Sequence, residues 1–103
     1  KPVIVITTFD DLDAAKKCAG LLVKHRLAAC VQVGSPVEST FRWNDEVVTD
    51  QEFVLTIKSS AGLFDELCTV IKQNHSYDVP EIIAVEISNI DHPYLEWMKE
   101  ELK

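Results

Sequence analysis

The sequence contains few cysteines, and their spacing does not suit a disulfide framework. Cys18, Cys30 and Cys68 are an odd number at wide intervals, and no CxxC motif occurs. This pattern favours a reducing compartment, and we expect a cytoplasmic protein. We predict that Cys18 and Cys68 lie on the apolar faces of helices, and that Cys30 lies in a tightly packed strand rather than as an exposed reactive thiol.

Long apolar runs and positive charge are also scarce. No run approaches the roughly 20 residues that span a bilayer, so we expect no membrane partner. Ten Lys and Arg residues are scattered along a chain with 17 Asp and Glu residues, and the net charge of −7 would repel a phosphate backbone. We therefore expect no nucleic-acid partner.

The common motifs of catalysis and nucleotide binding are missing. There is no GxSxG, P-loop or HExxH motif, and only three glycines occur in the chain. We therefore predict that the protein is not an enzyme, with no catalytic and no cofactor-binding residues.

The residues that are present are typical of one globular domain. The chain has 103 residues, of which 47% are hydrophobic and 26% are charged. We predict a single domain over residues 1–103.

The first third of the chain shows a strand, a helix and a second strand. Residues 3–8 are apolar and β-branched, which predicts a strand with both faces covered. Residues 10–27 begin with aspartates and end with basic residues, as helices do. Residues 28–33 predict a second strand, which Gly34 and Pro36 interrupt. The expected buried stripe of the helix consists of Ala15, Cys18, Ala19, Leu22 and Arg26.

The remaining elements follow from the same signals. Residues 37–58 alternate with period two around Asn44-Asp45, which predicts a long hairpin with a two-residue turn. A second helix is expected to be capped by Ser59 or Ser60 and to end near residues 74–75. Residues 81–87 predict a strand, and residues 92–102 predict a closing helix. The closing helix has Asp91 at its cap, Pro93 in its first turn, and a buried side formed by Tyr94, Leu95, Met98 and Leu102.

The order of these elements predicts an α+β fold. Strand, helix, strand, strand, helix, strand is the split βαβ arrangement, an antiparallel sheet with both main helices on one face and a C-terminal helix in addition. The first and last strands are apolar on both sides, so side chains such as Ile4, Ile6 and Ile82 would face water in a single chain. Each would forgo about 1.5–3 kcal/mol of burial energy. We therefore predict an obligate homo-oligomer, in which sister chains cover the second face.

The segment NHSYDVPEI, residues 74–82, allows two interpretations. It can end a helix and turn the chain, because Pro80 forbids helical geometry at Val79, while Tyr77 packs its ring and finds a partner for its hydroxyl. Alternatively, a pocket at a subunit boundary is lined by His75, Tyr77, Asp78 and Glu81.

Three further residues on the predicted hairpin are candidates for a cleft between subunits. Trp43 beside the turn suits a contact between subunits. Arg42 and Lys58 could pair with Glu81, or with an anionic ligand, across such an interface. His25 and His92 are expected at the surface, near helix ends.

Five blocks of the sequence together resemble the CutA family of divalent-cation tolerance proteins. They are RLAACVQV (26–33), ESTFRWNDEV (38–47), LTIKSS (55–60), HSYDVPEIIAV (75–85) and YLEW (94–97). The resemblance covers nearly the whole chain. It implies a ferredoxin-like domain that assembles as a stable homotrimer, and a role in tolerance of copper and other divalent cations.

The resemblance also implies where a metal would bind. In bacterial members, a copper site uses a cysteine at the end of the first strand and two adjacent histidines at the end of the second main helix. This chain has Thr7 and Asn74 at two of these positions, so His75 is the one remaining match. Threonine and asparagine are poor copper ligands. The loop also departs from the pattern at Ser76 and Asp78, and Phe41 replaces a tyrosine.

Three hypotheses on function follow. The first is a trimeric tolerance protein that binds copper or another divalent cation, with His75 as the metal ligand. The second is a signalling or interaction trimer that binds a small anionic ligand or a protein in the clefts between subunits. The third is an enzyme with a pocket around His75, Tyr77 and Glu81. We favour the first and keep the second as the alternative.

Overall fold

The computed structural model describes all residues from 1 to 103, which form five strands and three α-helices. In chain order these are β1 (Pro2–Phe9), α1 (Leu12–Lys24), β2 (Cys30–Val33), β3 (Val37–Trp43), β4 (Glu46–Ser60), a 3-10 turn (Ala61–Leu63), α2 (Phe64–Gln73), β5 (Ile82–Glu86) and α3 (His92–Glu101).

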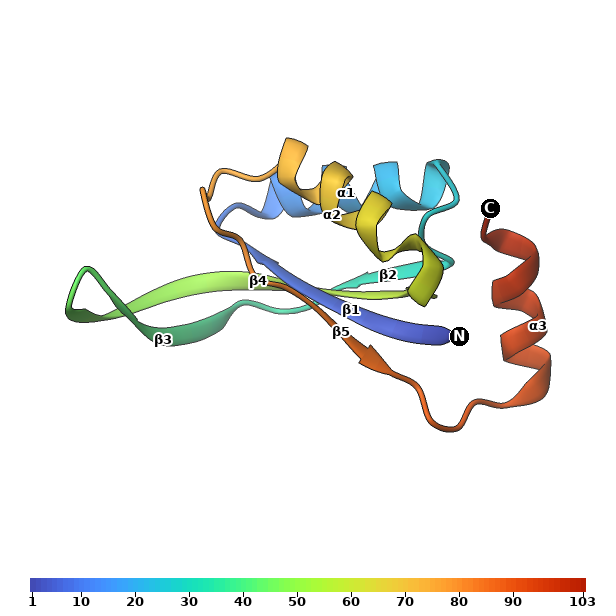
Figure 1. The fold of residues 1–103 in the computed structure, drawn as a ribbon. Helices are drawn as coiled ribbons and strands as arrows, with labels where there is room; N and C mark the ends of the chain where they lie inside the picture. Colours follow the sequence, from blue (N-terminus) through green and yellow to red (C-terminus); the bar gives the residue numbers. More distant parts are fainter.

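The strands form one antiparallel sheet, and the two main helices lie on one of its faces. The order across the sheet is β2-β4-β1-β5, and β3 pairs with β4 beyond the end of β2. Helices α1 and α2 cover the upper face in Figure 1, while α3 stands at the end of the sheet near the N-terminus. The predicted α+β, ferredoxin-like arrangement is therefore confirmed.

Strands β2 and β3 are two parts of one interrupted strand. Val33 lies opposite Leu55 and Val37 lies opposite Glu52, so three residues on one strand face two on the other. Such an extra residue bends a strand locally. The break at residues 34–36 thus redirects the chain without changing its partner, β4.

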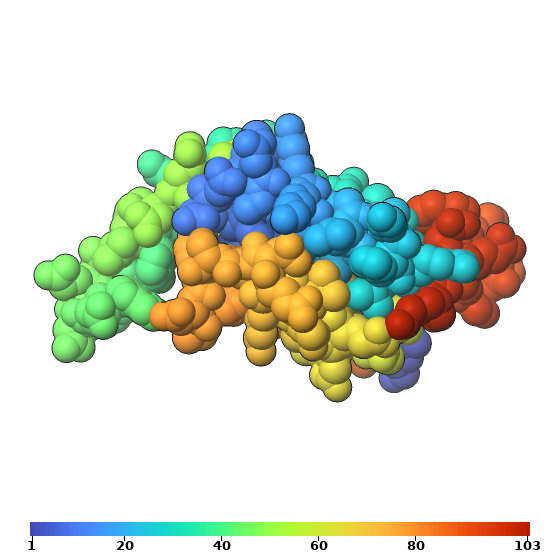
Figure 2. Space-filling model, turned by 90° about the horizontal axis from the view of Figure 1, so that it is seen from above, coloured from blue at the N-terminus to red at the C-terminus, as the bar shows by residue number.

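The β3–β4 hairpin projects beyond the rest of the sheet. Strand β1 ends opposite Phe53, so residues 46–52 of β4 pair with β3 alone. Asn44 and Asp45 have φ angles of 51° and 66°, which confirms the predicted two-residue turn. The projection makes the molecule elongated, with extents of 45 × 25 × 24 Å, and it is seen in Figures 1 and 2.

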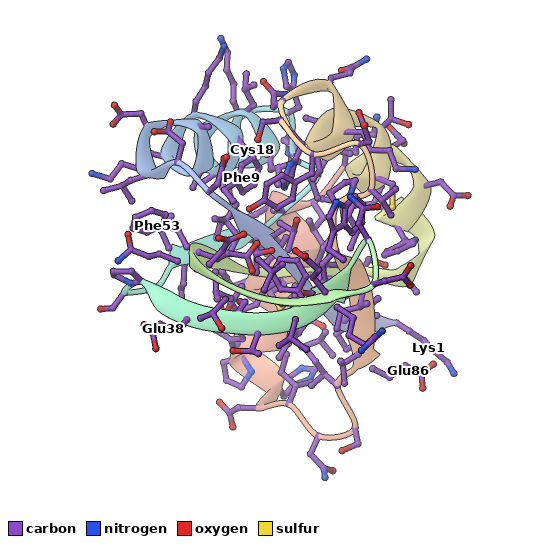
Figure 3. All side chains as sticks on the ribbon, turned by 90° about the vertical axis from the view of Figure 1, so that its left-hand side faces the viewer. Lys1, Phe9, Cys18, Glu38, Phe53 and Glu86 are labelled. Atoms are coloured by element: carbon purple, nitrogen blue, oxygen red, sulfur yellow. The ribbon has the colours of Figure 1, made fainter.

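The core lies between the two main helices and the sheet. Phe9 and Cys18 are buried there (Figure 3), as the apolar pattern of α1 predicts for Cys18. Burial raises the pKa of the Cys18 thiol to about 11, so this sulfur stays protonated and unreactive. Cys30 and Cys68 are only half-buried, and all three thiols are free. The fully buried large side chains of the core include Phe9, Leu22, Leu55, Ile57, Leu67, Ile71 and Val5.

The opposite face of the sheet is apolar at its centre and is left open by the chain. Ile4 and Ile6 of β1 lie opposite Val85 and Ile83 of β5 on this face. Ile83 and Val85 are 47% and 51% exposed. The expectation that Ile82 faces water is wrong, because Ile82 lies opposite Thr7 and packs against the core.

Helix α1 is shorter than predicted and ends in a Schellman motif. The N–H of Leu27 donates to the carbonyl of Leu22 at 2.9 Å, and the N–H of Arg26 donates to that of Val23 at 3.0 Å. Arg26 is exposed and has a φ of 60°. The prediction that Arg26 belongs to the buried stripe of this helix is therefore wrong.

Ser59 and Ser60 do not cap α2, contrary to the prediction. Both belong to β4, where they lie opposite Val3 and Pro2. The buried hydroxyl of Ser59 donates to the carbonyl of Leu27 at 2.6 Å. Helix α2 begins after the 3-10 turn, without a side-chain cap.

Helix α3 buries one side chain fully and exposes an aromatic pair. Met98 is buried, while Leu95 and Leu102 are half-buried. Tyr94 was expected on the buried side, but it is exposed in the single chain and packs against Trp97 with ring centroids 5.4 Å apart. None of the helices is both long and apolar enough to cross a membrane.

Candidate functional site

A hollow lies between the projecting hairpin and the segment that leads from α2 to β5. Its volume is about 540 Å³, and residues of β1, β3, β4 and 77–81 line it. Figure 2 shows the hairpin in green next to the orange segment that follows α2. The hollow exists because β1 stops at Phe9 while β4 continues outward, which leaves room above the hairpin for residues 77–81.

The lining of the hollow is acidic and aromatic. It contains no Lys, Arg or His residue. The carboxylates are Asp50, Glu52, Asp78 and Glu81, and the aromatic rings are those of Phe41, Trp43 and Tyr77. The other lining residues are Thr8, Ser39, Thr40, Val48 and Val79. A cation is therefore favoured in this hollow and an anion is not.

Glu52 is the most deeply buried of these acids. Only 7% of its surface is exposed. The hydroxyls of Thr8 and Tyr77 both donate to its Oε2, at 3.3 and 2.9 Å. The ion pairs of the chain are Lys1–Glu86, Lys99–Glu96 and Lys103–Glu66, so no cationic side chain neutralises Glu52.

His75 holds the adjoining segment against β1. Its ring stacks on Phe9 with centroids 4.3 Å apart. Its Nε2–H donates to the carbonyl of Thr8 at 2.5 Å, and its Nδ1 accepts from the backbone N–H of Tyr77 at 3.1 Å. Both ring nitrogens are therefore already hydrogen-bonded within the chain.

The hydroxyl of Tyr77 lies in the negative electrostatic field of the hollow. Burial, the hydrogen bond to Glu52 and the charges of Glu52, Asp10 and Asp50 together raise the pKa of its hydroxyl well above the usual 10.0. The phenol therefore stays neutral and remains a hydrogen-bond donor to Glu52.

The structure brings some of the predicted site residues together and leaves others apart. Trp43, Tyr77, Asp78 and Glu81 all line the hollow. His75 lies beside it and contacts Tyr77, with ring centroids 4.7 Å apart. His25, at the end of α1, and His92, at the start of α3, are exposed as expected.

The two predicted cations do not reach the hollow within one chain. Arg42 lies opposite Val47 on the other side of the hairpin and is exposed. Lys58 lies on the open face of the sheet, where its Nζ donates to Gln32 at 3.1 Å. Neither forms an ion pair with Glu81 in the chain.

Sequence reasoning missed Glu52, Asp50, Phe41 and Thr8 as site residues. In a period-two strand the neighbours of residues such as Phe53 ordinarily face solvent, and the sequence gives no reason to treat Glu52 differently. Glu52 is instead covered by Tyr77, which comes from a distant part of the chain. The local signal that was available is the placement of Asp50 and Glu52 on one side of the hairpin.

The residues at the positions where the resemblance implies copper ligands do not fit a copper ion within one chain. Thr7 is buried in the core and its Oγ1 has no hydrogen-bond partner. The side-chain amide of Asn74 donates to the carbonyl of Val70 at 2.8 Å. No three His, Cys, Asp or Glu side chains converge to hold a metal ion.

Comparison with known proteins matches almost the whole sequence to one family. Residues 3–101 match the family described as CutA1 divalent ion tolerance protein. The chain is 41% identical over 97 residues to Protein CutA 1, chloroplastic, of Oryza sativa, and 39% identical over 97 residues to Protein CutA, chloroplastic, of Arabidopsis thaliana. These matches cover 94% of the chain but only 55% and 53% of the two plant proteins, so the chain spans about half the length of these relatives.

A bacterial relative matches over almost its full length. The divalent-cation tolerance protein CutA of Thermus thermophilus is 39% identical over 97 residues, which cover 94% of each protein. A solved structure of the Thermus thermophilus divalent cation tolerance protein superposes with a TM-score of 0.97, at 37% identity over 100% of both chains. The fold and the sequence thus point to the same family.

Proposed function

Because the chain belongs to the CutA1 divalent ion tolerance family, we propose that it acts in divalent-cation tolerance as a homotrimer of one domain over residues 1–103. The family consists of tolerance proteins rather than enzymes, and the chain is classed with them. The observation that best supports cation binding is the hollow beside the hairpin, which has four carboxylates and no basic residue. A negative hollow raises the local concentration of cations.

Copper is the ion that we propose to test first, with His75 as its ligand. Because both ring nitrogens are hydrogen-bonded, binding at His75 would require the ring to release Thr8 or Tyr77. Further ligands would have to come from the carboxylates of the hollow or from another copy of the chain. The lining supports this only in part, since carboxylates prefer harder ions than copper.

Calorimetric titration of Cu²⁺ tests this assignment. We expect the His75→Ala variant to bind Cu²⁺ at least about tenfold more weakly than the wild type, since imidazole is a far better copper ligand than the groups around it. The matched control is His25→Ala, which removes an exposed histidine at the end of α1 and should bind as the wild type does. Equal binding by the wild type and both variants would refute a copper site at His75.

The proposed trimer rests on the open face of the sheet. Ile83 and Val85 are about half exposed there, next to Ile4 and Ile6, and a second copy of the chain is the simplest cover for such a surface. Light scattering at micromolar concentration should give a mass three times the 11.6 kDa of one chain. A folded species of 11.6 kDa would contradict the assembly.

The alternative is a signalling or interaction trimer with a small ligand at the boundaries between chains. The size of the hollow favours this alternative, because about 540 Å³ is within the usual range for small-molecule sites. Its lining does not favour the anionic ligand that we expected. A ligand-induced thermal shift that persists in the presence of a chelator would favour this alternative over metal binding.

For localisation, we propose the cytoplasm on the basis of the three free thiols. The plant relatives are named as chloroplast proteins, so this proposal concerns the present chain alone. Fractionation of the source cells with an antibody against the chain would test it.

A further inference from the structure

The hollow beside the hairpin has a chemistry that suits a ligand larger than a metal ion. We propose that it binds an aliphatic amine that carries two or more positive charges, between the carboxylates of β4 and those of residues 77–81. This inference goes beyond divalent-cation tolerance and does not depend on a metal. It rests on Glu52, on the aromatic rings of β3 and on the separation of the acidic groups.

Glu52 provides the first reason. Glutamate is rarely buried to this extent without a cationic partner, and Glu52 is only 7% exposed. Its two hydrogen-bond donors, Thr8 and Tyr77, are neutral and both reach Oε2. Oε1 accepts no hydrogen bond from the chain and is not sealed from solvent, so it remains available to a donor within the hollow. A protonated amine supplies both the missing charge and an N–H donor.

The aromatic rings provide the second reason. Phe41 and Trp43 are alternate residues of β3, so both point to the hollow side of the hairpin. In the single chain they are 38% and 55% exposed, so neither ring belongs to the core of its own chain. The face of an aromatic ring attracts an ammonium group, and Val48 and Val79 offer apolar surface for the methylene chain of such a ligand.

The placement of the acids provides the third reason. Asp50 and Glu52 come from β4, whereas Asp78 and Glu81 come from the segment before β5. They line one hollow, yet no three of them converge on a point where a metal ion could sit. Carboxylates spread around a space of about 540 Å³ suit charges that are separated along a flexible chain better than one compact ion.

Calorimetric titration of spermidine and of 1,4-diaminobutane into the purified protein tests the proposal. The buffer contains EDTA, so that failure of copper binding and failure of amine binding are independent results. We expect saturable binding of both amines, with a Kd at least about tenfold higher for 1-aminobutane, which has one charge. The uncharged 1,4-butanediol should give no binding heat.

Matched variants test whether the amine binds in the hollow. Glu52→Gln and Trp43→Ala should each raise the Kd for spermidine about tenfold or more, since each removes one type of contact. Asp45→Asn is the control, because it removes one negative charge at the exposed hairpin turn, outside the lining, and asparagine tolerates the left-handed backbone there. Its Kd should equal that of the wild type. Glu81→Gln, at an exposed position of the lining, serves if Glu52→Gln does not fold.

Three results would overturn the proposal. The first is the absence of saturable amine binding by the folded wild-type protein. The second is an equal effect of Asp45→Asn and of the lining variants, which would indicate attraction by net charge alone. The third is a crystal structure of the assembly with a Lys or Arg of another copy against Glu52, since the missing cation would then be part of the protein.

Discussion

At the scale of single residues, a short chain of contacts links β1, the segment after α2 and the hairpin. His75 bonds to Thr8 and to the backbone of Tyr77, and Tyr77 bonds to Glu52 on β4. His75 thus positions Tyr77, and Tyr77 positions Glu52, so hydrogen bonds from uncharged donors maintain the shape of the acidic hollow. The polar groups around Glu52 therefore position the site as well as stabilise the fold.

Tyr77→Phe should reveal the contribution of this chain to stability. At neutral pH we expect a loss of about 1–2 kcal/mol, since Glu52 loses a buried hydrogen-bond donor. The pKa of Tyr77 is raised in the folded protein, so its contribution is complete below the unfolded value of about 10 and decreases as the pH rises above it. The difference in unfolding free energy between wild type and variant should therefore shrink above pH ~10. Urea unfolding from pH 7 to 11, at one protein concentration, measures it.

Thr8→Val is the control for this pH dependence. It removes the other donor to the same oxygen of Glu52 but leaves the titrating phenol in place. Its stability should fall with alkaline pH as steeply as that of the wild type. If the curves for wild type and Tyr77→Phe run parallel up to pH 11, the inferred role of the phenol is refuted.

The sequence predicted part of this arrangement and could not predict the rest. The partner for the Tyr77 hydroxyl was expected, and so was a grouping of Tyr77, Asp78 and Glu81. The part played by Glu52 was not expected, because its burial depends on Tyr77, which lies 25 residues away in the sequence. Hydrophobic alternation reports which face of a strand meets the core, but it carries no information on what covers the other face.

At the scale of elements, period and turn chemistry predicted every strand and every α-helix, but not the 3-10 turn before α2, and tertiary contacts decided where several elements end. The Asn44-Asp45 turn was predictable because few residues adopt positive φ, and these two tolerate it. The end of α1 was not predictable in this way, because Arg26 takes a left-handed position that glycine usually occupies. Its guanidinium donates to the carbonyls of Glu100 and Glu101 at the end of α3, with Nε 2.9 Å from the oxygen of Glu101.

Arg26→Gly should separate the backbone role of this residue, which ends α1, from the role of its side chain, which bonds to the end of α3. The backbone of α1 should keep its Schellman bonds, while the end of α3 should lose two donors to its free carbonyls. Hydrogen exchange should therefore become faster at the amide of Leu102 and remain slow at that of Leu27. Mass spectrometry of deuterium uptake on overlapping peptides measures both.

Arg26→Ala is the companion variant, since it loses the same side-chain bonds and keeps a strained backbone. We expect it to be about 1 kcal/mol less stable than Arg26→Gly, because alanine pays the cost of left-handed φ. If alanine proves the more stable of the two, the strain at this position is not significant.

At the scale of the whole molecule, the chain leaves several surfaces without a partner, and two of them bear on assembly. One is the apolar face of the sheet, and the other is the edge of β4 over residues 46–52, which β1 does not reach. Unpaired strand edges and exposed apolar faces both favour association with other chains. The elongated shape thus follows from a chain whose hairpin extends beyond its own core, and both surfaces are consistent with the proposed trimer.

Val85→Lys should test the assembly directly. Val85 is 51% exposed on the open face, in the outer strand β5 and opposite Ile4. If copies of the chain cover this face, an ammonium group there is buried without a partner in every copy, and the mass from light scattering should fall from the trimer toward that of one chain. The control is Val23→Lys, on the exposed side of α1 near its C-terminus, where a cation is favourable. This variant should keep the wild-type mass. If Val85→Lys also keeps that mass with unchanged thermal stability, the open face is not the contact between chains, and the free edge of β4 becomes the surface to test.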